Sequence, residues 1–309
     1  MREIPFTFLR GFVMGAADVV PGVSGGTVAL VFAIYHRLID AVRTGSTALG
    51  RFLKFDIRGG IEALRSVEWV FFLPLVAGIG VAVAIMAGII EAALTDYPVE
   101  MAGLFLGLVA GSVVVAWQLL ERRDAPRLVM LLGVGAVTWV VLGLREGTSD
   151  ESVSQVADPA TWTYFGAGAI AICAMILPGI SGSFILVMLG MYGPILAAVN
   201  DRNLVPVALV ALGCVVGLAL FSQVLHWALA EHYDSVMAAM IGLMLGSLRV
   251  LWPWPAGLDS TSIGAPSDPW VWPTAFAVGG AILVVGFNEV AKFLERRTSA
   301  DEAAELKST

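Results

Sequence analysis

Six long apolar segments restrict this chain to a small set of folds. They cover residues 69–92, 99–120, 127–144, 204–230, 235–251 and 271–294. A helix of about 20 residues is needed to cross the roughly 30 Å hydrocarbon core of a bilayer. Because that core offers the backbone no hydrogen-bond partners, such segments have to satisfy their own N–H and C=O groups as helices. The sequence therefore predicts an all-α polytopic membrane protein.

Composition agrees with a membrane location. Of the 309 residues, 58% are hydrophobic and 14% are charged, whereas soluble domains carry about 25% charged residues. The net charge of −7 gives no indication of a nucleic-acid partner. Cys173 and Cys214 lie in apolar stretches, which favours buried thiols over a disulfide. No cofactor or metal site is predicted, and the oligomeric state stays open.

A motif that interrupts apolar sequence occurs twice. PGVSGGT occupies residues 21–27 and PGISGSF occupies residues 178–184, an offset of 157 residues. Further along, GLVAGS and GLMLGS match at the smaller offset of 135, because an insertion at 43–68 lengthens the first copy. The chain is therefore predicted to consist of two copies of one unit, residues 1–148 and 160–309.

Each interrupted stretch is predicted to form a re-entrant helical hairpin with the motif at its turn. Between Arg10 and Arg37 each arm has about ten residues and reaches about 15 Å, half of the hydrocarbon core. The hairpin places all but three of the 18 Lys and Arg residues on the cytoplasmic side, as the positive-inside rule requires. A single kinked helix would instead place the basic loop 37–68 opposite the N-terminus.

The number of crossings decides how the second copy is oriented. A unit of one hairpin and about three transmembrane helices crosses the membrane an odd number of times, so the second copy has inverted topology. Inverted repeats with broken helices that meet near the midplane are typical of secondary transporters. Both termini are expected in the cytoplasm. The basic, mildly amphipathic insertion 43–68 is expected among the lipids of the inner leaflet.

The residue types of the motif suit an anion site. Proline ends the first arm and glycine lets the chain reverse, while Ser24 and Ser181 are placed to cap the second arm. The start of that arm carries roughly half a positive charge and exposes backbone N–H groups. The alternative is a tight turn whose N–H groups are satisfied internally. The candidate binding residues are Gly22, Ser24, Gly25, Gly26, Thr27, Gly179, Ser181, Gly182 and Ser183.

The two copies differ near their turns. Asp18 in the first copy has Met175 as its counterpart, and Thr27 has Phe184. A carboxylate at the negative end of a helix has to be protonated, paired with a cation or solvated. Asp18 is therefore a candidate coupling site for H⁺ or Na⁺, with solvation through a cytoplasmic vestibule as the alternative.

Other polar side chains lie within or beside the apolar segments. Arg249 lies near the outer interface, where it either contacts a lipid head group or extends to water. His226, Gln223 and Asn288 show no evident partner in the sequence and are read as packing or pore-lining groups.

The doubled motif resembles that of a bacterial membrane family formerly classed as a domain of unknown function, the PopT-type polyprenyl-phosphate transporters. PGVSGGT near the N-terminus, PGISGSF at mid-chain and a length near 300 residues carry the resemblance over the whole chain. It implies a non-enzymatic flippase that returns undecaprenyl phosphate from the outer to the inner leaflet of the cytoplasmic membrane. The positions of this sequence that match the family's motif are Pro21, Gly22, Ser24, Gly25, Gly26, Thr27, Pro178, Gly179, Ser181, Gly182 and Ser183.

Two other classes of protein fit parts of the pattern. Opposed half-helices also build channels for anions or small solutes. GVSG and GISG match the GxSG pattern of intramembrane serine hydrolases, which need a base beside the serine. The three histidines, His36, His226 and His232, are poor candidates for that base because of where they lie in the sequence.

Overall fold

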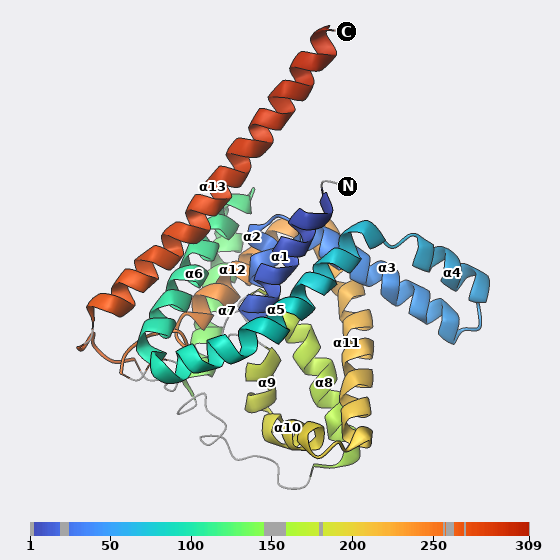
Figure 1. Ribbon diagram of the computed structural model, residues 1–309, viewed down its shortest axis with the longest axis horizontal. Helices are drawn as coiled ribbons and strands as arrows, with labels where there is room; N and C mark the ends of the chain where they lie inside the picture. The colour runs from blue at the N-terminus through green and yellow to red at the C-terminus, as the bar shows by residue number, and fades with distance from the viewer. Residues whose placement is uncertain are drawn as a thin grey trace.

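The computed structural model describes residues 3–18, 25–144, 159–178, 182–255, 257, 263–268 and 270–308. Within these residues every regular element is a helix (Figure 1). The helices are α1 (Glu3–Asp18), α2 (Gly25–Val31), α3 (Tyr35–Leu53), α4 (Ile57–Arg65), α5 (Trp69–Asp96), α6 (Pro98–Leu119), α7 (Ala125–Gly143), α8 (Thr161–Ile176), α9 (Gly182–Met188), α10 (Tyr192–Asn200), α11 (Leu204–Glu231), α12 (Tyr233–Ser247) and α13 (Val271–Ser308).

Five helices are long and apolar enough to cross a membrane. They are α5, α6, α7, α11 and the part of α13 from Val271 to Val290. Their outward faces are apolar as well, since Leu132, Leu220 and Ile282 are each 63–65% exposed. Exposed side chains of this kind suit contact with lipid rather than water. These features confirm the all-helical, multi-pass part of the prediction.

The sixth predicted segment, 235–251, differs from a simple spanning helix. Its helix, α12, has 15 residues and therefore a length of about 22 Å. From Leu248 to Trp252 each N–H bonds to the carbonyl three residues earlier, a tighter geometry that adds about 10 Å. Pro253 then ends the run because proline has no N–H to donate. The segment thus reaches the thickness of a bilayer core only through its tightened end.

The helices pack in two matching sets of pairs. α1 packs along α5, and α8 packs along α11. In the first pair, any side chain added at Gly11 would overlap the backbone of Leu75. In the second pair, Gly168 lies in the same way against Val210. Gly168 follows Gly11 by 157 residues and Val210 follows Leu75 by 135, so the contact occurs at the offsets found in the sequence.

The remaining spanning helices pair across the two halves. α13 packs along α6, and α7 packs along α12 (Figure 1). Gly107 lies directly against the backbone of Ala277, and its counterpart Gly242 lies directly against that of Leu131. Small residues spaced four apart let membrane helices approach this closely. Each half therefore receives its last helix from the other half.

An ion-pair cluster lies where α1, α3 and α5 begin. Arg37, near the start of α3, contacts Glu3 at the start of α1 at 3.3 Å and forms two hydrogen bonds to Glu68, just before α5. The guanidinium also lies over the Phe71 ring, 4.4 Å from its centroid. The hydrogen bond from Arg37 lowers the pKa of Glu68. The starts of α1, α3 and α5 therefore lie together.

The two interrupted stretches also contact each other. The hydroxyl of Tyr35, just after the first stretch, donates to the carbonyl oxygen of Ile176 at 3.1 Å. Ile176 is the last residue of α8 and lies two residues before the second motif. Tyr35 is 3% exposed and belongs to the hydrophobic core, which is centred on α6 and α12. The core therefore holds the start of α3, which follows the first motif, against the end of α8, which precedes the second motif.

The second arms of the two stretches end in the same way. At the end of α2, Ala33 has φ +55°, and the N–H of Ile34 bonds to the carbonyl of Ala29. At the end of α9, Gly190 has φ +66°, and the N–H of Met191 bonds to Leu186. These positions are again 157 residues apart. A left-handed residue with this bond pattern is a common helix end for which glycine is best suited.

The exposed Ala33 should therefore tolerate glycine better than alanine. Relief of its left-handed strain is expected to make Ala33→Gly more stable by about 0.5–1 kcal/mol. The reverse change, Gly190→Ala, should cost about 1 kcal/mol or more. Thermal unfolding of the purified variants in detergent measures both effects. Changes of the same sign in the two variants would contradict this account of the helix ends.

The cross-half contact between α6 and α13 gives a second prediction. Gly107→Ala should reduce the free energy of unfolding by about 2 kcal/mol or more, because the new methyl group overlaps the Ala277 carbonyl. Gly133→Ala is the matched control, since nothing lies within 4 Å of a methyl group there. Unchanged stability in Gly107→Ala would show that this pair of helices can separate at little cost.

Candidate functional site

The structure describes part of the predicted site. Gly22, Ser24, Gly179 and Ser181 lie outside the described residues, as does the side chain of Ser183. Their proposed roles stay predictions. The described members are Asp18, Gly25, Gly26, Thr27, Gly182 and Arg249.

Asp18 and Gly25 lie together where the first stretch turns. Asp18 is the last residue of α1 and Gly25 is the first of α2. The Gly25 N–H donates to Asp18 Oδ1 at 2.6 Å, and a side chain at Gly25 would overlap the carboxylate. From the sequence, this carboxylate was expected to be protonated, paired with a cation or solvated. A hydrogen bond from a backbone N–H group was not expected. A negative charge at the start of a helix is stabilised by such N–H groups.

The equivalent place in the second copy has different chemistry. Met175 occupies the position of Asp18 at the offset of 157, one residue before the end of α8, and its side chain lies directly against Gly182 at the start of α9. The thioether is at most a weak acceptor, so it does not compete for an N–H group as a carboxylate does. In both copies, therefore, a side chain near the end of the first arm lies against the first glycine of the second-arm helix. That side chain carries a carboxyl group only in the first copy.

The described part of the first turn is closed. Gly25, Gly26 and Thr27 are buried, and Thr27 is 2% exposed. A ligand could reach the backbone N–H groups of these residues only after α1 or a neighbouring helix moved away. The structure thus represents a state in which the first turn is covered and the Gly25 N–H is taken by Asp18.

Arg249 lies apart from the turns, on the tightened end of α12. Its guanidinium packs against Gly143 at the end of α7, and its Cζ is 5.5 Å from the centroid of the Trp139 ring. Nε is buried without a hydrogen-bond acceptor. Within the described residues, no ion pair to Arg249 occurs. This cation is therefore positioned by packing and keeps its capacity to bind an anion.

Three polar side chains have partners that the sequence did not reveal. His226 Nδ1 lies 2.8 Å from Asp40 Oδ1 and joins α11 to α3. Asn288 Nδ2 donates to Gln118 Oε1 at 3.4 Å and joins α13 to α6. Gln223 donates to the carbonyl four residues earlier. Only proximity in the fold could identify the first two pairs, because their members are more than 150 residues apart in the chain.

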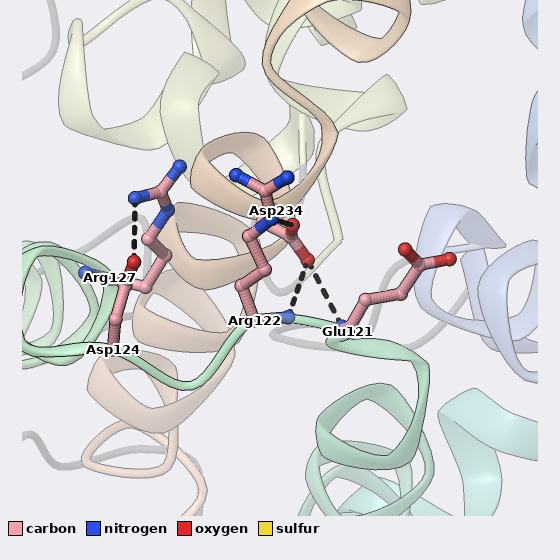
Figure 2. A network of polar contacts seen from close by, with 5 residues as sticks. All are labelled: Glu121, Arg122, Asp124, Arg127 and Asp234. Atoms are coloured by element: carbon pink, nitrogen blue, oxygen red, sulfur yellow. Dashed lines mark hydrogen bonds and ion pairs between the residues drawn. The ribbon is translucent and has the colours of Figure 1, made fainter.

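The loop between α6 and α7 is fixed to α12 by a polar network (Figure 2). Asp234, in the first turn of α12, accepts hydrogen bonds from the backbone N–H groups of Glu121 and Arg122 at 3.0 and 3.1 Å. The Glu121 side chain points away from Asp234 (Figure 2). Asp124 caps α7 by accepting from the Arg127 N–H and also pairs with the Arg127 guanidinium at 2.9 Å. The network therefore holds the start of α7 beside the start of α12.

These features define a multi-pass helical membrane protein whose sequence carries a glycine-rich motif twice. Residues 14–264 match the VCA0040-like family, described as undecaprenyl phosphate translocase-like. The chain belongs to this family, which confirms the resemblance seen in the doubled motif.

Two relatives extend the comparison. The polyprenyl-phosphate transporter of Vibrio cholerae serotype O1 (strain ATCC 39315 / El Tor Inaba N16961) is 38% identical over 254 residues, which cover 82% of this chain and 79% of the relative. The polyprenyl-phosphate transporter of Staphylococcus aureus (strain NCTC 8325 / PS 47) is 27% identical over 306 residues, 95% of this chain and 97% of the relative. No solved structure gives a significant match.

The network around Asp234 makes a direct prediction. Asp234→Ala leaves two backbone N–H groups without their acceptor and should reduce the free energy of unfolding by about 1–3 kcal/mol. Asp234→Asn keeps an acceptor oxygen and should lose less. Thermal unfolding in detergent measures both variants. Equal losses in the two would show that the charge of Asp234, and not its hydrogen bonds, holds the loop.

Proposed function

We propose that this protein is a secondary transporter that moves undecaprenyl phosphate from the outer to the inner leaflet of the bacterial cytoplasmic membrane. The phosphate head is bound in turn by the two PGxSG regions, and the tail stays in the lipid. The substrate is inferred from the two relatives, which are named polyprenyl-phosphate transporters. The chain matches each of them over most of its length. Return of the carrier to the inner leaflet would serve synthesis of the cell envelope.

The single observation that carries a transport mechanism is the recurrence of the same packing at two offsets. The contact of Gly11 with Leu75 matches that of Gly168 with Val210, at offsets of 157 for the glycines and 135 for their partners. The ends of α2 and α9 also match, at the offset of 157. Residues 1–148 and 160–309 form two units of the same construction. In one state the first unit is closed and the second is open, and in the other state the reverse holds. With inverted topology the exchange gives alternating access from the two sides of the membrane.

The two hairpins provide the stopping point for the head group. In the proposed arrangement α1–α2 enters from the cytoplasm and α8–α9 enters from outside, with both chain termini cytoplasmic. The hydrogen bond from Tyr35 to Ile176, which joins the start of α3 to the end of α8, supports an arrangement in which the two turns lie near each other. Backbone N–H groups at these turns would hold a phosphate without a buried lysine. The head group can then pass from one turn to the other while it stays near the midplane.

Asp18 supplies the proposed coupling to an ion. Its carboxylate holds the Gly25 N–H at 2.6 Å, so a phosphate and an ionised Asp18 compete for the same donor. Protonation of Asp18, or its neutralisation by Na⁺, releases that donor to the phosphate. Among the described residues Asp18 has no ion-pair partner that would replace this ion. Met175 in the second copy carries no charge that has to be neutralised, so the proposed ion coupling involves the first turn.

The first test is the thermal stability of the purified protein with undecaprenyl phosphate or with the dephosphorylated alcohol. A ligand that binds only the folded state should stabilise it by about 2.7 kcal/mol at a hundredfold excess over Kd. We expect this shift with the phosphate and a much smaller one with the alcohol. Equal shifts would mean that the tail alone is recognised. No shift with either lipid, together with fast flux of small anions, would identify a channel.

The coupling is tested by Asp18→Asn and Asp18→Met, the second of which copies the residue of the other turn. Without a competing charge, each variant should bind undecaprenyl phosphate about tenfold more tightly or better. Transport into proteoliposomes should respond to an imposed H⁺ or Na⁺ gradient in the unmodified protein and lose that response in both variants. A gradient response that survives in both would remove Asp18 from the coupling mechanism.

A further inference from the structure

A shallow groove of about 360 Å³ runs between α7 and α12. Leu132, Gly135, Ala136, Trp139, Leu245 and Gly246 form most of its apolar lining. Gly135 and Gly246 lie where the two helices approach closely, since a methyl group at Gly246 would overlap Thr138. Leu132 is 65% exposed on the rim, so the groove opens toward the surroundings of the helices and not into the core. In a membrane this opening faces lipid tails.

A cation lies at one end of this groove. Trp139 both lines the groove and stacks on Arg249, whose Cζ is 5.5 Å from the ring centroid. The buried Nε of Arg249 has no acceptor, and no described carboxylate pairs with the guanidinium. An unmatched donor of this kind is costly unless an acceptor arrives. Apolar surface and a cation that has no acidic partner among the described residues therefore meet at Trp139.

The position of Arg249 along the bundle corresponds to the head-group layer. Trp252 and Trp254 follow it, and their indole N–H groups donate to the carbonyls of Gly264 and Ser267 at 3.0 Å each. At the other end of the same loop, Trp270 and Trp272 are 56% and 63% exposed, as in the aromatic belt of a membrane interface. Arg249 also contacts Gly143, the last residue of α7. This is the opposite end of α7 from the network of Figure 2.

We propose that the α7–α12 groove and Arg249 form a docking site for a lipid monophosphate. The first isoprene units lie in the groove, and the phosphate oxygens accept hydrogen bonds from the guanidinium, which binds phosphate well through its planar array of donors. The proposal rests on the proposed function and adds a second site for the same substrate, apart from the turns. In the proposed orientation it collects the lipid from the outer leaflet before the head group reaches α8–α9.

The head-group part is tested with Arg249→Gln and Arg249→Lys. Loss of a charge-assisted hydrogen bond should weaken binding of undecaprenyl phosphate about tenfold or more in Arg249→Gln, while binding of undecaprenol stays unchanged. Arg249→Lys should retain part of the affinity. Thermal stability of each variant without lipid separates lost binding from lost folding. If inorganic phosphate competes with the lipid at equal concentration, the site is one for free anions and the proposal fails.

The groove is tested by filling it from its exposed side. Ala136→Trp should weaken binding of both undecaprenyl phosphate and undecaprenol about tenfold. Val137→Trp is the matched control, because Val137 is the next residue of α7, is 64% exposed and does not line the groove. A polyprenyl phosphate with a photoreactive group near the head should cross-link to α7 and α12 in the unmodified protein and not in Ala136→Trp.

The outcomes separate this site from the proposed function. Binding of undecaprenyl phosphate with cross-links confined to α1–α2 and α8–α9 would overturn the docking site and leave the transporter intact. Equal affinity in Ala136→Trp and Val137→Trp would overturn it as well. If the unmodified protein binds no undecaprenyl phosphate, both the proposed function and the docking site are wrong.

Discussion

Direct contact between helix backbones is the interaction on which the rest of this structure depends. Helices in lipid gain little from burying apolar side chains against each other, because lipid tails are equally apolar. Association then relies on dispersion and close approach, which glycine permits. Gly11, Gly107, Gly168 and Gly242 each lie against the backbone of a partner helix. The positions of α1, α6, α8 and α12 follow from these contacts, and the two motif regions are placed by the helices that carry them.

Much of this arrangement could be predicted from the chain itself. Apolar length defined the spanning helices, and the repeat offsets anticipated which positions correspond. Periodicity does not specify partners, however, so the pairing of α6 with α13 and of α7 with α12 could not be derived. The short α12 was missed because hydropathy does not distinguish an α-helix from its tighter continuation through Leu248–Trp252. Pro253 is the only sequence signal of that change.

The candidate site was predictable in its location and less so in its chemistry. The motif marked the turns, and comparison of Asp18 with Met175 marked the difference between them. The hydrogen bond from the Gly25 N–H to the Asp18 carboxylate could not be predicted from the sequence, because that contact depends on how the chain folds between the two residues. For the same reason the proximity of Arg249 to Trp139 was invisible, since α7 and α12 lie in different halves.

The exchange of terminal helices between the halves has a consequence for the order in which the protein is made. The glycine face of α6 is complete when α6 is made, yet its partner α13 is synthesised only after α7 to α12. α7 likewise has to wait for α12. Neither half can therefore complete its packing alone, and the first half has to persist in the membrane with vacant contact surfaces.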